Sequence, residues 1–138
     1  KAGKLAKDRA WFCFDTCHAR SAGYDLATHD NGDGSGKKRT IADARAIADD
    51  VLDEFDAICG LDNLRVLHCN DSKGARGSRI DRHEHLGKGH VSKGAFAAIL
   101  NRPELVDVPL ILETPKGEDE KGTPFDTLNL RVLRRLMD

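Results

Sequence analysis

Apolar side chains gather in three short continuous runs, which are separated by longer polar or amphipathic segments. The runs are Trp11–Phe14, Leu64–Leu67 and Val108–Leu112. Their short length and their content of aromatic and aliphatic side chains are typical of buried strands. The pattern therefore predicts a core built on three strands.

A segment with helical periodicity follows the first run. Thr40 can cap its beginning, Asp43 stands in its first turn, and Gly60 is a natural end. Between these signals the apolar side chains recur at helical spacing, at Ile41, Ala44, Ile47, Ala48, Val51, Leu52, Phe55 and Ile58. This spacing predicts one amphipathic helix.

Two further helices are predicted after the second and third runs. Ser92 can cap a helix that ends before Pro103, and Thr123, with Pro124 in the first turn, can begin a last helix. Their apolar positions are Ala95, Phe96, Ile99 and Leu100 in the first and Phe125, Leu128, Val132, Leu133 and Leu136 in the second. Strands that alternate with helices predict an α/β fold with a parallel sheet and right-handed crossovers.

The connecting segments are polar and rich in glycine, so we expect loops over residues 15–38, 68–91 and 115–124. The first of them contains "HDNGDGSGKK" at residues 29–38, which looks like a calcium-binding loop. However, Gly32 stands where a loop that begins at Asp30 needs an oxygen ligand. We therefore expect no calcium site in this segment.

Composition narrows the classes of function. The chain has 138 residues, 33% of them charged, with a net charge of −1, which suits one folded domain without an overall basic field. No apolar stretch reaches the ~20 residues of a membrane helix, and Lys1–Asp8 lacks the apolar core of a signal peptide. We therefore expect a cytoplasmic protein with no membrane partner. The first residue is Lys, which hints at a piece of a longer protein.

The four cysteines form no recognisable chemical motif. Cys13 and Cys17 are four positions apart rather than in a C-x-x-C pair, which argues against a zinc knuckle. Thiols this few, beside apolar strand residues, also do not make the disulfide frame of a secreted domain. We expect all of them to be packing residues: Cys13, Cys17, Cys59 and Cys69.

A metal-capable side chain follows each predicted strand. Asp15 comes after the first strand, His68 after the second and Glu113 after the third. In parallel α/β folds the carboxyl ends of the strands share one edge, where ligands bind, so we expect these side chains to converge. Each of them alone has an ordinary explanation, since Asp often caps a helix or turn and Glu in a loop is usually solvated.

The same loops supply three further candidate ligands. His18 lies three positions beyond Asp15, while Asp81 and His83 are two apart in "RIDRHEHLG" and can project the same way from an extended segment. Carboxylates and imidazoles without thiolates suit zinc, manganese or iron. The other histidines are tied to no strand end, and we expect no part in the site for His29, His85 and His90.

The motifs "FDTCHARSAGYD", "LHCNDSKGARGSRIDRHEHLGKGH" and "PLILETP" together resemble the endonuclease IV family of apurinic/apyrimidinic endonucleases. The likeness covers nearly the whole chain in order and implies that residues 1–138 are the C-terminal portion of one such domain. It implies three βα units of a TIM (β/α)8 barrel with three zinc ions. Because three of eight strands leave an open sheet edge, we expect an incomplete barrel here.

The resemblance also implies roles for the candidate residues. Asp15, His68 and Glu113 would be catalytic and would hold one zinc ion, with Glu113 near a second. The third ion would lie among His18, Asp81 and His83, because the family pattern selects His83 rather than His85 in "DRHEH". Manganese is an alternative to zinc at one of the sites.

The implied reaction is hydrolysis of the phosphodiester on the 5′ side of an abasic site in duplex DNA, a step of base excision repair. Zinc ions would activate a water and neutralise the leaving oxygen, so that no side chain need act as the nucleophile. The resemblance implies a monomer at full length. The 138-residue chain alone would be incomplete for activity.

A local excess of positive charge lies between Lys73 and Lys93, and it suits contacts with phosphate. We expect four DNA-binding residues from this segment: Lys73, Arg76, Arg79 and Arg82. Arg82, which stands between two expected ligands, would be nearest to the scissile phosphate. The alternative is an ordinary solvated loop.

Two other functions stay open. Sugar isomerases and epimerases of the xylose-isomerase-like barrels also gather His, Asp and Glu around one or two divalent metals, although a small sugar requires no basic loop. The third possibility is an inactive fragment that forms no competent site. The insertion over residues 29–38, longer than the resemblance predicts, would leave the metal residues in place and change the contacts to substrate.

Overall fold

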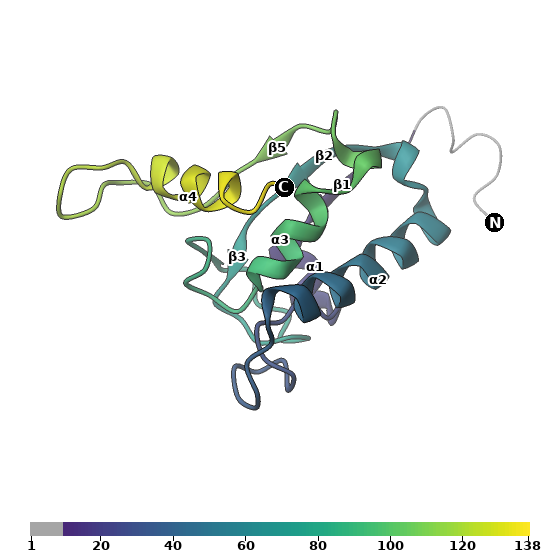
Figure 1. Cartoon of the computed structure of the whole chain (residues 1–138), viewed down its shortest axis with the longest axis horizontal. Coiled ribbons are helices and arrows are strands. Elements are labelled where there is room, and N and C mark those ends of the chain that lie inside the picture. Colours follow the sequence, from purple (N-terminus) through teal and green to yellow (C-terminus); the bar gives the residue numbers. More distant parts are fainter. Residues whose placement is uncertain (1–9) are drawn as a thin grey trace.

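The computed structural model describes residues 10–138 (Figure 1). Residues 1–9, in which the sequence predicted no signal peptide, lie outside the described part. A small sheet carries two helices on one face, and the last helix with its preceding loop extends to one side. Within residues 10–138, none of the helices is long and apolar enough to cross a membrane.

The sheet has the strand order β1–β2–β5, and its strands are parallel. β1 spans Phe12–Asp15, β2 spans Leu64–His68 and β5 spans Leu110–Ile111. The register pairs Asp15 with His68, and His68 with Ile111. The predicted parallel α/β fold is confirmed, and the strand ends that carry candidate ligands are direct neighbours.

Helices α2 (Ile41–Cys59) and α3 (Lys93–Leu100) lie side by side on one face of the sheet (Figure 1). Both begin where the sequence predicted, because the hydroxyls of Thr40 and Ser92 accept hydrogen bonds from backbone N–H groups in their first turns. Such a bond satisfies a donor that the start of a helix leaves free. α2 ends at Gly60, whose φ of 80° suits glycine.

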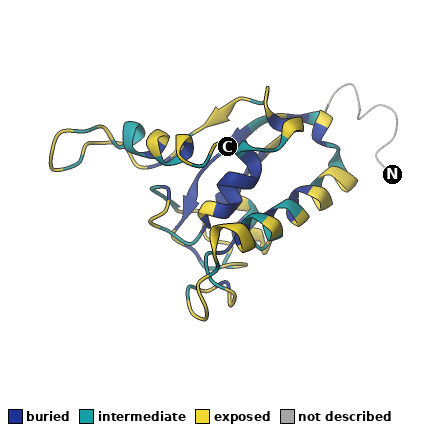
Figure 2. Cartoon of the chain, viewed as in Figure 1, coloured by how far each residue is buried: buried dark blue, intermediate teal, exposed yellow. Residues whose placement is uncertain are grey.

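The core lies between the sheet and these two helices (Figure 2). α3 is buried on nearly all sides and places Phe96, which is fully buried, against the strands. α2 buries one stripe, including Ala48 and Leu52, and exposes a face rich in Asp and Glu. Burial of a side chain as large as Phe96 contributes roughly 1.5–3 kcal/mol, so this layer supplies much of the stability.

A short helix, α1 (Thr16–Ala22), follows β1 directly, where the sequence predicted a loop. The loop prediction is wrong because α1 is held by contacts that local periodicity does not show. Its buried side includes Arg20 and Ser21, and the Ser21 hydroxyl donates to the Ile80 carbonyl at 2.8 Å. A helix that buries polar side chains against a distant segment carries no apolar stripe.

The predicted loop over residues 68–91 contains a small antiparallel sheet. β3 (Asp71–Ser72) pairs with β4 (His83–Glu84), and Ser72 lies opposite His83. Strands of two residues are too short for alternation to be read, which is why the pattern missed them. Their pairing returns His83 to the segment that leaves the end of β2.

The last helix, α4 (Phe125–Arg134), begins directly after Pro124, and no side chain caps it. The prediction of Thr123 as its cap is wrong, because Pro124 occupies the cap position. Thr123 belongs to the preceding turn, where its N–H donates to Asp119 Oδ1 at 2.8 Å. The buried residues of α4 are Asn129 and Leu133. Two short 3-10 helices, Leu61–Asn63 and Pro103–Leu105, complete the described elements.

The insertion over residues 29–38 is a folded projection whose ends pair through His29 and Lys38. We refer to it as the 29–38 hairpin. Arg20, only 1% exposed, anchors it: Nη2 donates to the Gly32 carbonyl at 2.5 Å and Nε to the Gly74 carbonyl at 3.2 Å. One buried guanidinium therefore ties this hairpin to the segment that follows β3.

Candidate metal centre

The first donor group stands at the ends of the three parallel strands. Asp15 ends β1, His68 ends β2, and Glu113 comes shortly after β5. His68 Nδ1 lies 2.8 Å from Glu113 Oε2 and 3.5 Å from Asp15 Oδ2. One ligand atom from each side chain therefore faces a common point, which is the convergence that the sequence predicted.

The second donor group joins α1 to β4. His18 Nε2 lies 3.2 Å from Asp81 Oδ1, and His83 Nε2 lies 3.3 Å from the same oxygen. The rings of His18 and His83 have centroids 5.7 Å apart. These three predicted residues offer ligand atoms within reach of one ion. Asp81 and His18 are exposed, so this group opens to solvent, whereas His83 lies further inside.

His83 connects the two donor groups. Its Nδ1 lies 3.1 Å from the Glu113 carbonyl oxygen, which leaves Nε2 directed at the carboxylates of Asp15 and Asp81. Nε2 is buried and has no hydrogen-bond partner of good geometry among residues 10–138. A buried imidazole nitrogen without such a partner fits a metal ligand, because neutral imidazole and carboxylate are the ligands that zinc takes.

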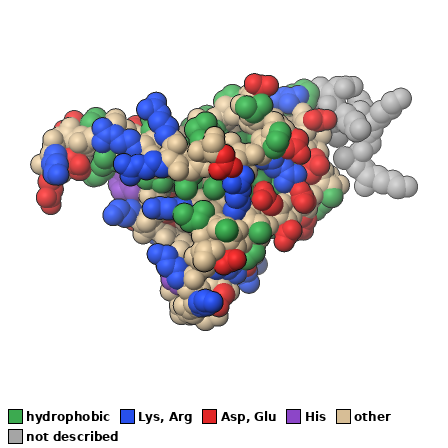
Figure 3. All heavy atoms as spheres, in the orientation of Figure 1, with side chains coloured by type: hydrophobic (Ala, Val, Ile, Leu, Met, Phe, Trp, Pro, Cys, Tyr) green, Lys and Arg blue, Asp and Glu red, His purple; other side chains and the backbone are tan. Residues whose placement is uncertain are grey.

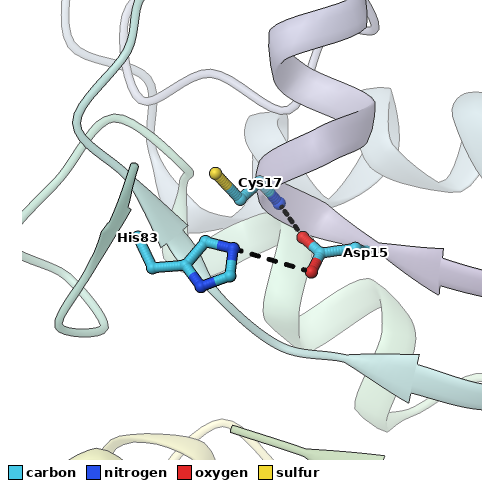
Figure 4. Close-up of side chains that lie close together, drawn as sticks. All are labelled: Asp15, Cys17 and His83. Atoms are coloured by element: carbon cyan, nitrogen blue, oxygen red, sulfur yellow. Dashed lines mark hydrogen bonds and ion pairs between the residues drawn. The ribbon is translucent and has the colours of Figure 1, made fainter. Parts of the chain in front are cut away.

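Asp15 serves two purposes at once (Figure 4). Its Oδ1 accepts the backbone N–H of Cys17 at 2.7 Å and that of His18 at 3.1 Å, so it begins α1. Its Oδ2 lies 3.9 Å from His83 Nε2 and 3.5 Å from His68 Nδ1. One oxygen of Asp15 therefore caps a helix, as Asp often does, and the other oxygen is the candidate metal ligand.

Cys17 is a residue near this centre that the sequence assigned only to packing. It is fully buried, and its sulfur offers a third possible donor beside Asp15 and His83. In Figure 4 the side chain of Cys17 points away from the Asp15 carboxylate, and only its backbone nitrogen bonds to it. Burial raises the pKa of the Cys17 thiol. Its Sγ lies 3.9 Å from the Arg82 carbonyl oxygen, a contact that suits the packing role the sequence assigned to it.

Asn70, which the sequence analysis did not select, links the strand ends. It is fully buried, and its Nδ2 donates to Asp15 Oδ2 at 2.8 Å. Its Oδ1 accepts the Glu113 N–H at 2.8 Å, and its own N–H donates to Thr16 Oγ1 at 2.9 Å. One amide thus orients two candidate ligands from different strands. The available signal was its place in "HCND", two positions beyond His68.

The sequence analysis also did not select Asp71, which stabilises the segment that carries His83. It is fully buried and accepts four backbone N–H groups, from Ser72, Gly87, Gly89 and Val91, at 2.8 to 3.0 Å. Burial raises the pKa of Asp71, and these hydrogen bonds oppose that shift without cancelling it. Asp71 therefore acts as the internal support of the segment between β3 and α3.

The four predicted DNA-binding residues differ in their surroundings. Arg82 is exposed and lies between Asp81 and His83 in the chain, while Lys73 is exposed with Nζ 3.8 Å from Glu84. Arg79 is exposed and has a φ of 57°, rare for a residue other than glycine. Arg76 forms an ion pair with Asp25 at 2.8 Å, so its charge is engaged beside the 29–38 hairpin.

Charge is distributed unevenly over the surface. On the face shown in Figure 3, Asp and Glu side chains gather over α2, whereas Lys and Arg are more frequent around α4. A polyanion would be repelled by the α2 side of this face. The acidic surface of α2 is therefore an unfavourable place for phosphate.

A cavity of about 660 Å3 adjoins the first donor group. Asp15, His18, His68 and Glu113 lie at its polar end, and the remaining wall is mostly apolar, with Phe14 and Phe55 among its residues. The donors therefore border a recess large enough for part of a substrate.

Known proteins with similar sequences were compared with this chain. Residues 2–134 match the family of xylose isomerase-like TIM barrels. Two relatives are each named a probable endonuclease 4: one from Geobacter sulfurreducens, 44% identical over 99% of this chain, and one from a Geobacillus species, 50% identical over 87%. The chain spans 40% and 35% of their respective lengths.

A solved structure of an endonuclease IV is similar to this chain in its fold. The chain resembles the crystal structure of endonuclease IV from Thermus thermophilus, with a TM-score of 0.64 and 39% identity. The similarity covers 90% of this chain and 37% of that one. The three strands of the open sheet thus correspond to part of a barrel, as the sequence predicted.

Proposed function

Because this chain belongs to the xylose isomerase-like TIM barrel family, we propose that it forms part of a zinc-dependent DNA repair endonuclease. The reaction is hydrolysis of the phosphodiester on the 5′ side of abasic sites in duplex DNA. The observation that carries the proposal is that six side chains from separate segments form two adjacent donor groups, with His83 Nε2 of the second 3.9 Å from Asp15 Oδ2 of the first: Asp15, His18, His68, Asp81, His83 and Glu113. The names of the relatives support the same class of enzyme.

The donor groups define which residues would hold metal. Asp15, His68 and Glu113 would bind one ion, and His18, Asp81 and His83 another, with three ions in the complete barrel and manganese as an alternative at one site. When bound, zinc supplies a nucleophilic water at neutral pH and neutralises charge on the leaving oxygen. Asn70 would keep Asp15 and Glu113 in place, since partners of the ligands fix ligand orientation.

The side chains of the β3–β4 segment would contact DNA. Arg82 is exposed next to Asp81 and His83, so its guanidinium would meet the phosphate nearest to the ions. Lys73 and Arg79, also exposed, would contact flanking phosphates. Arg76 would contribute less to phosphate binding because its charge is already paired with Asp25.

The test is incision of a labelled duplex with one abasic site by the full-length natural protein, with and without a chelator. We expect cleavage on the 5′ side, loss of activity with chelator and return of activity with zinc. Glu113→Gln should remove most of the activity, while Glu118→Gln, a matched change on the distal 115–124 loop, should not. Incision that is unaffected by thorough chelation would contradict the proposal.

The rival function is a metal-dependent sugar isomerase or epimerase, which the same family description also admits. Metal content of the full-length protein separates the two. About three zinc ions per chain favour the endonuclease, whereas one or two manganese or magnesium ions favour the isomerase. An inactive fragment would bind no zinc and incise no abasic duplex.

The remaining parts of the proposal concern the whole protein. We propose a cytoplasmic monomer in which residues 1–138 are the C-terminal portion of the barrel domain. The 138-residue chain alone would lack ligands that the other strands supply. Zinc titration and incision by the chain alone, beside the full-length protein, measure how much of the site it carries.

A further inference from the structure

Helix α4 buries a polar side chain in the middle of its apolar face. Phe125, Asn129 and Leu133 are four positions apart, so they lie on one face of the helix. Asn129 is only 3% exposed, and Leu133 is the other residue that α4 buries. A buried amide requires hydrogen-bond partners, whereas an apolar side chain would pack the helix without them. The partners of Asn129 therefore show what this amide contributes beyond packing.

Asn129 bonds to two segments that carry candidate ligands. Its Oδ1 accepts the backbone N–H of Leu86 at 3.0 Å, and its Nδ2 donates to Thr114 Oγ1 at 2.9 Å. Leu86 comes three residues after His83, and Thr114 directly follows Glu113. One amide on α4 therefore joins the segment of one candidate ligand to the segment of another.

The partners of this amide also fix its orientation. The backbone N–H of Leu86 can only donate, so the amide oxygen must face it and the amide nitrogen must face Thr114. The second N–H of Asn129 Nδ2 can donate to His85 Nδ1, which lies 3.2 Å away. The His85 ring is in turn held against Phe125, with ring centroids 4.4 Å apart. A buried network in which each polar atom has a partner is rigid.

The two segments that Asn129 joins also meet at the His83 ring, where Nδ1 lies 3.1 Å from the Glu113 carbonyl oxygen. When Nδ1–H donates to this oxygen, Nε2 keeps the lone pair that a metal ion needs. The bonds of Asn129 link the same two segments at residues close to both partners. If the segments moved apart, the bond from His83 to Glu113 would lengthen and the ring would be free to rotate.

We propose that Asn129 is a positioning residue, which holds the His83 segment against the Glu113 segment so that the His83 ring presents Nε2 to a metal ion. That this ion serves catalysis rests on the proposed function, whereas the orientation of the ring requires no ion. Asn129 is not a candidate ligand and acts through Leu86 and Thr114. The last helix thereby helps to build the metal centre.

The first test is zinc titration of the full-length natural protein. Asn129→Leu and Thr114→Val each remove a bond of the network at nearly constant volume. Both should bind zinc about 10–100-fold more weakly, as is usual when the support of a metal ligand is lost. Thr114→Ser keeps the hydroxyl, and Leu133→Ala deletes a buried apolar contact of the same helix. These two controls should bind zinc as the unaltered protein does, although Leu133→Ala will be less stable.

Cobalt in place of zinc adds a spectroscopic measurement, since its visible absorption depends on the geometry of the ligands. The cobalt spectrum should change in Asn129→Leu and stay unchanged in Leu133→Ala. A general loss of stability would affect both variants of α4 and would not select the one that breaks the network. Equal zinc affinities and equal cobalt spectra in these two variants would overturn the proposal.

A measurement on the metal-free protein requires no bound ion. In alkaline solution, where imidazole is neutral, nuclear magnetic resonance of 15N-labelled histidines reports which ring nitrogen carries the proton. His83 should be protonated on Nδ1 in the unaltered protein and should become a mixture of both forms in Asn129→Leu. Thr114→Val, a smaller change, gives the same measurement if Asn129→Leu does not fold. An unchanged His83 ring in the folded variant would overturn the proposal.

The outcomes separate this inference from the proposed function. Zinc-dependent incision by the unaltered protein, with equal zinc affinity in Asn129→Leu and Leu133→Ala, would overturn the positioning role and leave the endonuclease standing. Weaker zinc binding by Asn129→Leu alone, in a protein that incises no abasic duplex, would support the positioning role while the proposed endonuclease fails.

Discussion

Asp15 and Asp71 are both buried carboxylates near the same end of the sheet, but their oxygens have different partners. Both oxygens of Asp71 are occupied by backbone N–H groups. Asp15 uses Oδ1 to cap α1, while its Oδ2 accepts one hydrogen bond, from Asn70 Nδ2, and also lies near His68 and His83. A carboxylate saturated by amides builds a loop, whereas one that faces imidazoles with free lone pairs offers a ligand.

This contrast predicts opposite effects of the same Asp-to-Asn change at the two positions. Asp15→Asn keeps a side chain that caps a helix about as well, but removes the charge from Oδ2. We expect zinc affinity and incision to fall, the latter about a thousandfold, which equals roughly 4 kcal/mol of transition-state free energy. The unfolding free energy of the metal-free protein should fall by only about 1 kcal/mol, because the Asn70 amide alone loses its acceptor. Zinc titration and chemical denaturation in chelator measure the two effects.

Asp71→Asn should do the reverse. An amide has one acceptor oxygen in place of two, so about two of the four backbone N–H groups lose their partner. The expected loss is roughly 3 kcal/mol of unfolding free energy, since an unpaired buried donor costs about 1–3 kcal/mol. Asp107→Asn, an exposed change, is the control. If Asp71→Asn left stability intact and abolished zinc binding directly, the assignment of the two carboxylates would be wrong.

Asn70→Ala tests whether Asn70 holds the candidate ligands Asp15 and Glu113 in position for the metal. The change leaves all six candidate ligands in place but frees Asp15 Oδ2 and the Glu113 N–H from their common partner. Zinc affinity should fall about 10–100-fold, as is usual when a partner of a metal ligand is removed. Asn31→Ala, in the exposed hairpin, is the comparison. Equal zinc affinity in both variants would show that Asn70 supports the fold alone.

The smallest expected effect is the loss of folding stability in acid that follows when Asp25, which pairs with Arg39 and Arg76, is protonated. Burial alone would raise the pKa of Asp25, but hydrogen bonds from Arg39 and Ala27 and the charges of Arg39 and Arg76 outweigh it and lower the pKa. Its contribution is therefore present above the ordinary pKa, near 3.9, and is lost as pH falls through the folded value. Because Asp25 is partly exposed, we expect roughly 0.5–1 kcal/mol.

The measurement is denaturation at pH 7 and at about pH 3. Asp25→Asn should lower the unfolding free energy at pH 7 and should make it less dependent on pH than in the unaltered protein. Asp107→Asn, an exposed change outside the residues that pair with Asp25, should leave this difference in place. A variant at Asp25 with the full acid sensitivity of the unaltered protein would rule out this pair as its source.

Much of the fold was readable from local signals. The Thr40 and Ser92 caps and the stop at Gly60 depend on residues within a few positions of one another, and the structure has each of them. The three strands lie within a residue or two of the predicted runs, although the third is shorter than predicted. Alternation of strands and helices then placed Asp15, His68 and Glu113 at one edge, because parallel strands end on the same side.

The parts of the fold that the sequence did not predict depend on contacts between segments that are far apart in the chain. Helix α1 was missed because it buries Arg20 and Ser21 against residues near 74 and 80, so no apolar stripe marks it. Thr123 was chosen as a cap on residue preference, but the helix begins one residue later, with Pro124 at the cap position, and Thr123 bonds to Asp119 in the preceding turn. Local preference is a weak guide where tertiary hydrogen bonds compete with it.

The sequence by itself determined which residue types stand at the strand ends, since hydrophobic periodicity and capping act over short distances. Only the tertiary structure decided that Asn70 joins two ligands, that Asp71 supports the His83 segment and that Asn129 joins the His83 and Glu113 segments. Those features depend on hydrogen bonds and close approach between segments that are separated along the chain, and such pairings leave no period in the sequence.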